Sequence, residues 1–513
     1  MYADIVVERG RIRSVQPAAH GTTIRTEHGV FTFPGGHVLP GFVDSHAHLF
    51  GLGLRLTTTS LHTATSANDC AQRMAQGPLQ GGWARAMGWN QELWDVTAFP
   101  TKDTLDAVFP DTPAVARRVD GHALWVNSAA LRAAGIDDTT PDPAGGTILR
   151  DTLGQATGIL VDHAMELVER CMPMFTDEEM TELYRIAADH CASKGITEVH
   201  DMDVSPAWLG PLRALAERGA LATRVQAYVS GQHDEWINAG LLPAGGEFLR
   251  LHGVKLFADG ALGSRGAYLL APYHDDPSTV GLELLTTQRI VQAGRAVLDA
   301  GWWALAVHAI GDAAVRTVLD AFAEIRTLPG GADLTLRLEH AQHVHPDDVR
   351  RFAELHVHAM VQPTHCTSDA PMAEQRLGPD RLPWAYRWRS LLDANATLAG
   401  SSDFPIEPAD PVAGIDAFCR RVPDGATQSW QPQERLTRDE AILAFTSWGH
   451  RVAEVDRRRG RIAEGFDADM VVVDQDLMSC ADEDIRATSI LATFTAGTLR
   501  YQRPDLHETR PTA

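Results

Sequence analysis

The middle of the chain alternates short apolar stretches with longer amphipathic ones. The segment at 287–301, TQRIVQAGRAVLDAG, carries apolar residues at helical spacing, whereas stretches such as GVKLF are short apolar runs typical of buried strands. Strand-like runs that alternate with helices predict β/α units around a parallel sheet. The sequence therefore predicts an α/β protein.

Both ends of the chain show a different pattern. The segments at 3–15 (ADIVVERGRIRSV) and 490–502 (ILATFTAGTLRYQ) each read as two short strands, joined by turns at Arg9-Gly10 and Ala496-Gly497. A further strand is expected in ADMVVVDQD at 468–476. The termini are therefore predicted to contribute short antiparallel strands outside the central sheet.

The net charge of the chain indicates which classes of partner it can bind. The 513 residues include 45 basic and 67 acidic side chains, and the net charge of −22 disfavours nucleic acid and anionic membrane as partners. A small-molecule substrate is expected instead. The six cysteines lack the paired spacing of a disulfide framework or a thiolate zinc site, and the acidic start MYADIVVERG is unlike a signal peptide. A cytoplasmic protein is expected.

One apolar run ends on two histidines, in GFVDSHAHLF at 41–50. Side chains two positions apart point to the same face of a β-strand, so His46 and His48 can reach one point in space. Such a pair is a candidate metal site. Because the chain has 22 histidines, including a second H-x-H pair at His356 and His358, chance pairing is the alternative at this point.

Four later runs show the same feature, an apolar stretch that stops abruptly at a potential ligand or a polar loop. The runs are LHGVKLFADG with Lys255, GWWALAVHAIGD with His308, LTLRLEHAQH with His340 and ATLAGSSDFP with Asp403. Catalytic groups occupy such strand ends at the C-terminal face of a (β/α)8 barrel. Each residue alone has a structural alternative, as a surface lysine, a hydrogen-bonded histidine or a helix-capping aspartate. Their order along the chain favours one shared site.

The residue types fit a metal centre. Imidazole and carboxylate are the usual ligands of zinc and similar ions, whereas an ammonium group cannot ligate. Lys255 fits if CO2 has added to its amine, because the resulting carbamate has two oxygens that can bridge two ions roughly 3.5 to 4 Å apart.

These motifs closely resemble the amidohydrolase superfamily, specifically its YtcJ-like branch (amidohydrolase family 3), which includes N-substituted formamide deformylases. The resemblance rests on HVLPGFVDSHAHL, VKLFADGALGSRGA, AVHAIGD, RLEHAQ and GSSDFPIEP, and extends to GWNQELWD, RRVDGHALWVNSAAL, QPTHCTSDAPMAEQRLG and GRIAEGFDADMVVVD. It covers nearly the whole chain. Asn90 and Cys366 depart from the pattern expected in the branch, so the substrate of any one relative does not carry over directly.

The resemblance implies a (β/α)8 TIM barrel with a small β-sandwich domain formed from both chain termini. The expected boundaries are 1–39 and 451–502 for the sandwich and 40–450 for the barrel. An insertion is expected at about 75–175, where a Gly/Pro/Asp-rich stretch indicates separate structure. The tail at 503–513 is expected to be flexible.

The resemblance also implies a role for each ligand. His46 and His48 would bind the more buried metal ion, His308 and His340 the second, and carbamylated Lys255 would bridge them. Two zinc ions are expected, with manganese or iron as alternatives. Asp403 would contact the metal centre; as general base and acid, it would take the proton of a metal-bound hydroxide and pass it to the leaving nitrogen.

A second group of residues is expected near the substrate: Trp89, Asp120, His122, Trp125 and Arg265. His122 and Arg265 are also candidate catalytic residues, because each could contact a substrate carbonyl or oxyanion. The alternatives are a packed aromatic cluster with a hydrogen-bonded histidine and, for Arg265, an internal ion pair.

The predicted function is a metal-dependent hydrolase that cleaves a C–N bond of an amide, an N-substituted formamide or a cyclic amide. Deamination of a heterocycle and hydrolysis of a lactone or ester are alternatives, since the same activated water can attack these centres. A catalytically silent metal-binding barrel is the alternative from a different class. The sequence leaves a homodimer open.

Overall fold

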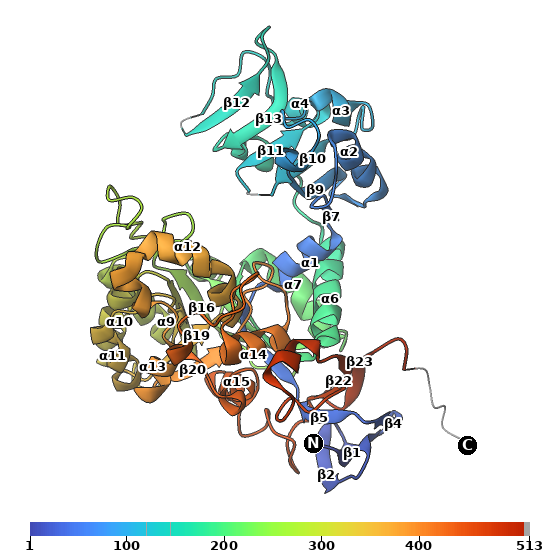
Figure 1. Ribbon diagram of the computed structural model, residues 1–513, viewed down its shortest axis with the longest axis vertical. Coiled ribbons are helices and arrows are strands. Elements are labelled where there is room, and N and C mark those ends of the chain that lie inside the picture. Colours follow the sequence, from blue (N-terminus) through green and yellow to red (C-terminus); the bar gives the residue numbers. More distant parts are fainter. Residues whose placement is uncertain (120, 144, 507–513) are drawn as a thin grey trace. The chain divides into compact units, whose positions relative to one another are not determined.

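The central sheet consists of eight parallel strands (Figure 1). In spatial order they are β20 (Thr397–Gly400), β19 (Val357–Val361), β18 (Thr335–His340), β17 (Ala304–Ala309), β16 (Leu249–Phe257), β15 (Arg224–Ser230), β14 (Ile196–Val204) and β6 (Phe42–Ala47). The structure is a computed structural model that describes residues 1–119, 121–143 and 145–506. The chain divides into two units, Met1–Leu52 with Tyr184–Ala513, and Gly53–Leu183.

Burial and capping explain these elements. Every residue of β6 and β18 is buried, as expected for parallel strands covered on both faces. The predicted helical segment forms α9 (Thr287–Asp299), which begins where the Thr286 side chain accepts a hydrogen bond from the backbone N–H of Arg289. Other helices that follow the strands are α7 (Leu209–Glu217), α8 (Glu235–Asn238), α10 (Asp312–Arg326), α11 (Val349–Glu354), α12 (Pro363–Arg381), α13 (Trp388–Asp393), α14 (Pro411–Arg420), α15 (Arg438–Ala444) and α16 (Ser447–Val452).

The first and last strands of this sheet are joined by buried hydrogen bonds just beyond β20. Ser402 donates from Oγ to Asp44 Oδ2 at 2.5 Å and from its backbone N–H to Asp44 Oδ1 at 3.1 Å. The backbone N–H of Asp403 donates to the carbonyl of His46 at 2.9 Å. The sheet is therefore a nearly closed barrel, and the predicted α/β barrel fold is confirmed.

Two four-stranded sheets come from the chain ends. One contains β1 (Ala3–Glu8), β2 (Arg11–Pro17), β3 (Gly21–Thr26) and β4 (Gly29–Pro34), and the other β5 (His37–Pro40), β21 (Met470–Val473), β22 (Ile490–Thr495) and β23 (Thr498–Gln502). Both predicted turns are present, with positive φ at Arg9, Gly10, Ala496 and Gly497. The two sheets share one buried core, which includes Ile5, Ile24, Val472 and Phe494.

One pairing in these sheets differs from the expected antiparallel pattern. β1 pairs antiparallel with β2 but parallel with β3, because the chain crosses after β2 to reach the other edge of β1. The proposed domain boundaries stay predictions. Of the predicted tail, residues 507–513 lie outside the described residues.

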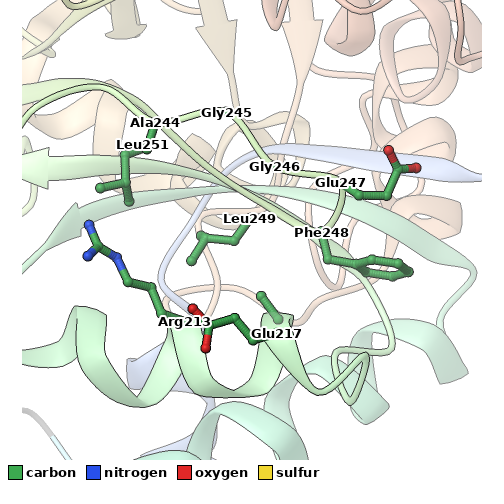
Figure 2. A pocket seen from close by; sticks show the side chains of 10 residues that line it. Arg213, Glu217, Ala244, Gly245, Gly246, Glu247, Phe248, Leu249 and Leu251 are labelled. Atoms are coloured by element: carbon green, nitrogen blue, oxygen red, sulfur yellow. The ribbon is translucent and has the colours of Figure 1, made fainter.

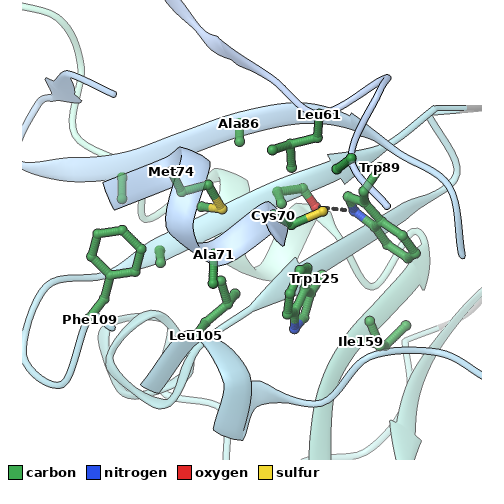
Figure 3. Close-up of a cluster of buried hydrophobic side chains, with 14 of the residues drawn as sticks. Leu61, Cys70, Ala71, Met74, Ala86, Trp89, Leu105, Phe109, Trp125 and Ile159 are labelled. Atoms are coloured by element: carbon green, nitrogen blue, oxygen red, sulfur yellow. Dashed lines mark hydrogen bonds between the residues drawn. The ribbon is translucent and has the colours of Figure 1, made fainter. Parts of the chain in front are cut away.

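The second unit, Gly53–Leu183, has its own sheet and core. The sheet contains β7 (Thr59–Ser60), β8 (Leu79–Gln80), β9 (Trp83–Trp89), β10 (Ala114–Arg118), β11 (Ala123–Val126), β12 (Gly146–Arg150) and β13 (Ala156–Asp162). Helix α2 (Ala67–Gln76) contributes Cys70 and Met74 to a buried cluster that also contains Trp89 and Trp125, with Cys70 next to the tryptophans (Figure 3). The segment predicted as an insertion lies within this unit.

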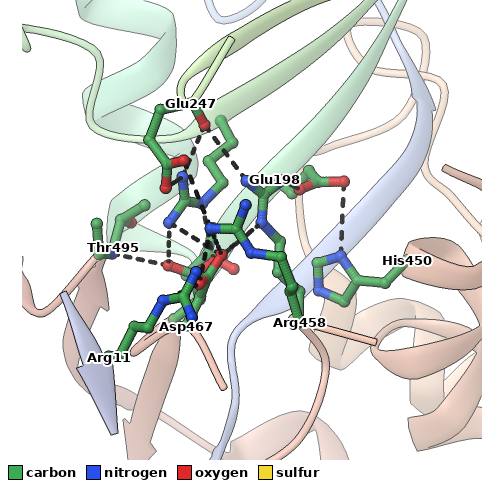
Figure 4. Close-up of polar contacts among 12 residues, drawn as sticks. Arg11, Glu198, Glu247, His450, Arg458, Asp467 and Thr495 are labelled. Carbon is green, nitrogen blue, oxygen red and sulfur yellow. Dashed lines mark hydrogen bonds and ion pairs between the residues drawn. The ribbon is translucent and has the colours of Figure 1, made fainter. Parts of the chain in front are cut away.

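Buried charges connect the C-terminal sheet to the barrel (Figure 4). Arg224, the first residue of β15, donates from Nε to Asp469 Oδ2 at 2.9 Å, and both side chains are about 1% exposed. Arg459 donates to Asp467 at 3.1 Å and to Glu198 of β14 at 2.7 Å. These charges are paired within a protein interior, where an unpaired charge is costly.

In the described part of the chain, no helix combines the length and apolarity that a bilayer crossing requires.

Asp469→Ala is expected to lower the free energy of unfolding by about 3 to 5 kcal/mol, because it leaves the buried guanidinium of Arg224 without its main partner. The measurement is urea unfolding followed by circular dichroism. Arg11→Ala is the matched control: its ion pair with Asp467 spans 3.7 Å and its side chain is 53% exposed, so a loss of at most about 1 kcal/mol is expected. Equal losses in the two variants would contradict the assignment.

Candidate metal centre

All six predicted ligand residues line one cavity of about 420 Å³: His46, His48, Lys255, His308, His340 and Asp403. His46, Lys255, His308 and His340 lie at or near the C-terminal ends of β6, β16, β17 and β18, while His48 and Asp403 lie just beyond β6 and β20. The cavity therefore lies at the C-terminal face of the barrel, where this fold places its catalytic groups.

The ligand atoms are close enough to share metal ions. Asp403 Oδ1 lies 3.2 Å from His48 Nε2 and 3.5 Å from His46 Nε2. The His340 ring centroid lies 4.7 Å from that of His46 and 4.4 Å from that of His308. One potential ligand atom each from His46, His340 and Asp403 lie within 4.8 Å of one another.

Hydrogen bonds fix the orientation of three of the imidazoles. The Nδ1 atoms of His46, His48 and His340 lie 2.5 Å from Glu339 Oε2, 3.0 Å from the Met202 carbonyl and 2.9 Å from Gln362 Oε1, respectively. Each of these oxygens accepts the Nδ1 hydrogen, so the Nε2 lone pair is available to a metal ion.

Electrostatics favour the protonation states that ligation requires. Burial, together with the nearby charge of Lys255, lowers the pKa of His46 to about 4, and burial holds the pKa of His340 well below its usual value. Burial opposes ionisation of Asp403, but the surrounding histidines outweigh it and hold the pKa of this carboxyl well below its ordinary range. His46 and His340 are thus neutral and Asp403 is ionised, whereas at His48 burial is outweighed by the Asp403 carboxylate, which raises the pKa of that imidazole.

The backbone gives separate evidence that these positions are special. His340 and Asp403 adopt φ values of 76° and 59°. Residues other than glycine rarely occupy this left-handed region, and such conformations gather at functional sites because surrounding structure must hold them.

Lys255 has the surroundings needed to act as a ligand after modification. Its side chain is fully buried, and Nζ has no hydrogen-bond partner among the described residues. Burial lowers the pKa of the amine, which favours the neutral form that can react with CO2. A buried amine without a hydrogen-bond partner fits a divalent metal site better than it fits a packed core.

Two residues of the site escaped the sequence prediction. Glu339 precedes His340 and orients His46, while His365 follows β19 at the start of α12 and lines the cavity. The signal for His365 was the same as for the ligands, because HVHAMVQPTH is another apolar run that ends on a polar sequence.

Arg265 does not line the cavity and forms the internal ion pair that was its alternative. Its Nη2 lies 2.9 Å from Asp275 Oδ2. Asp275 also pairs with Arg376 of α12, so the two arginines share one carboxylate.

The aromatic residues expected near the substrate belong to the second unit. Trp89 and Trp125 are completely buried in its core and donate their indole N–H groups to the carbonyls of Ala116 and Thr101. They are packing residues, because they expose no surface to a ligand. His122 lies 2.9 Å from Asp162 through Nδ1 and Oδ1, and Asp120 lies outside the described residues.

A second cavity, of about 440 Å³, lies between α7 and the loop before β16 (Figure 2). Arg213 and Glu217 line it from α7, and residues 244–249 and 251 line it from the other side. Among its described lining residues there is no histidine or cysteine, so it is not a second candidate for the metal centre.

The fold and the site are those of a metal-dependent hydrolase. The chain belongs to the amidohydrolase family, which it matches over residues 34–501, and the resemblance inferred from the motifs is confirmed.

Individual relatives support this assignment. The chain is 35% identical to YtcJ of Bacillus subtilis (strain 168), a protein named as an amidohydrolase, over 91% of this chain and 90% of the relative. It is 27% identical to the N-substituted formamide deformylase of Arthrobacter pascens, over 92% and 90% of the two chains. An uncharacterized metal-dependent hydrolase from Pyrococcus furiosus has a similar structure, with a TM-score of 0.78 and 29% identity over 93% of this chain and 98% of that one.

Glu339→Gln is expected to weaken metal binding by about 10- to 100-fold, because an amide in this place would direct N–H groups toward Arg337 or the Nδ1 hydrogen of His46. Affinity can be measured by competition with a chromophoric chelator. Glu407→Gln is the control, since Glu407 lines the same cavity but accepts from Ser368 rather than from a histidine. An unchanged affinity in Glu339→Gln would show that the carboxylate does not orient His46.

Proposed function

We propose that this protein hydrolyses the C–N bond of an amide, an N-substituted formamide or a cyclic amide. The observation that carries the proposal is the position of Asp403, whose carboxylate lies within 3.5 Å of Nε2 in both His46 and His48, at the mouth of the barrel. We also propose which residues form the site and which metal ions they hold.

His46 and His48 would hold one divalent ion and His308 and His340 a second, with the carbamate of Lys255 between them. Zinc is proposed, with manganese or iron as alternatives. When bound, such ions lower the pKa of a coordinated water and polarise a substrate carbonyl.

Asp403 is proposed to move the proton. Its carboxylate is ionised and can accept a proton from the attacking water, then return it to the leaving nitrogen. Bond cleavage then releases an amine and a carboxylic acid, or formate from a formamide, whereas a cyclic amide opens to one product that carries both groups.

The cavity wall supports a substrate with an apolar substituent. Its apolar lining residues are Phe257, Ala261, Leu262, Ile310, Met372 and Ile406. These side chains, rather than the tryptophans suggested by the sequence, would receive the N-substituent. The relative that is named an N-substituted formamide deformylase agrees with a substrate of this class.

The proposal also covers the class of partner and the cellular location. A small-molecule substrate fits a cavity of this size, and nucleic acid and membrane partners are not proposed for a chain of charge −22. A cytoplasmic location is proposed, supported by six cysteines that are all free.

Metal-loaded protein is expected to hydrolyse at least one member of a panel of N-alkyl and N-aryl formamides, acyl amides and cyclic amides, detected as released amine and acid. Asp403→Asn should lower kcat by about 10²- to 10⁴-fold, since it removes the proton acceptor. Asp369→Asn is the control, because Asp369 lines the cavity but accepts a hydrogen bond from Tyr386.

Other outcomes of this panel have definite meanings. Turnover of esters, lactones or amino-heterocycles alone would replace the amide assignment by one of those reactions. Metal-loaded protein that turns over nothing would identify a catalytically silent barrel.

Protein purified without chelator is expected to contain about two metal ions per chain, and Lys255→Ala fewer, as measured by inductively coupled plasma mass spectrometry. The physical reason is that the carbamate is the only proposed ligand shared by both ions. Lys102→Ala is the control, because that lysine lies in the second unit, where it donates to a backbone carbonyl. Full metal content and activity in Lys255→Ala would refute the bridging lysine.

A further inference from the structure

His365 is a buried histidine that lines the cavity and has no place in the proposed chemistry described so far. It is 7% exposed and lies in the first turn of α12. Its Nε2 atom has no hydrogen-bond partner in the described part of the protein, although a buried polar nitrogen is normally paired. Because His365 lines the cavity, a molecule bound there can supply this partner.

The neighbouring amide determines which ring nitrogen carries the hydrogen. Gln342 Nε2 lies 3.2 Å from His365 Nδ1. An amide nitrogen only donates, so Nδ1 accepts this bond and the hydrogen of the neutral ring lies on Nε2. His365 thus offers an N–H donor to the cavity, while His46, His48 and His340 offer lone pairs.

The donor points toward the reacting centre. His365 Nε2 lies 3.9 Å from Asp403 Oδ2, which is too long for a hydrogen bond. A substrate oxygen that accepts a hydrogen bond from this N–H at about 2.8 Å can nevertheless lie close to Asp403. An atom in this place is next to the group that moves the proton.

We infer that His365 is a further catalytic residue, whose Nε2–H donates a hydrogen bond to the substrate oxygen on which negative charge develops when the carbonyl is attacked. This inference rests on the proposed amide hydrolysis. The bond stabilises the tetrahedral oxyanion more than the planar carbonyl, and no proton is transferred in the process.

The test compares two His365 variants. His365→Leu removes the donor and should lower kcat about 10²- to 10³-fold with little change in KM. His365→Gln keeps an N–H donor on a side chain of similar reach and should recover part of that loss. Ser368→Ala, one helical turn further along α12, should retain the parent kcat.

A binding measurement separates this inference from the proposed function. A phosphonamidate is a tetrahedral amide analogue with anionic oxygen, so His365→Leu should bind it at least about 10-fold more weakly than the parent does, by calorimetry. Metal content per chain should be the same in parent and variant. Loss of metal in His365→Leu would overturn the inference by making His365 a ligand.

The combined outcomes are distinct. A parent that hydrolyses amides while His365→Leu keeps full kcat overturns the inference alone. A parent that hydrolyses no amide but binds the phosphonamidate through His365 overturns the proposed function and leaves the donor role standing. A parent that neither hydrolyses nor binds overturns both.

Discussion

The site depends on the meeting of the first and last strands of the barrel. His46 and Asp403 are at opposite ends of the strand order, so no local segment can bring them together. The bonds from Ser402 to Asp44 and from the Asp403 backbone to His46 hold the two ends in contact, and they are buried from water. Barrel closure therefore also assembles the candidate metal centre, because these bonds fix the Asp403 carboxylate next to the histidines.

A network of buried hydrogen bonds inside the barrel also helps to fix the site. Arg337 is fully buried and donates to both oxygens of Glu339, to the Ser45 carbonyl and, through Nη1, to His200 Nδ1. Removing these charges from water costs free energy, and a fully hydrogen-bonded network can offset that cost while it specifies a single arrangement. Here that arrangement directs the Glu339 carboxylate toward His46. The buried charges of Arg337 and Glu339 therefore serve to hold the His46 imidazole in one orientation.

The barrel and the six proposed ligand residues, which line one cavity, could be predicted from the sequence because both follow from local rules. The end of each strand is recognisable in the sequence as the point where an apolar run stops. In a barrel of parallel strands, these C-terminal ends lie together at one face. Trp89 and Trp125 were expected near the substrate because an aromatic residue in a core and one in a pocket have the same local pattern, and the structure places both in the core of the second unit. Glu339 was missed because its role depends on a histidine from a distant strand. His365 carried the same strand-end signal as the proposed ligands, but the orientation of its ring depends on the tertiary contact with Gln342 and could not be predicted.

The buried charges beneath the barrel also constrain the order in which a growing chain can fold. Glu198 and Arg224 leave the ribosome early, whereas their partners Arg459, Asp467 and Asp469 are made only after all eight barrel strands. β5, which leads directly into the strand that carries His46, likewise cannot pair with β21 until that late segment has been made. Until the last segment is made, Glu198 and Arg224 lack these three partners, so the end of an incomplete barrel that carries them is expected to be exposed to chaperones and proteases.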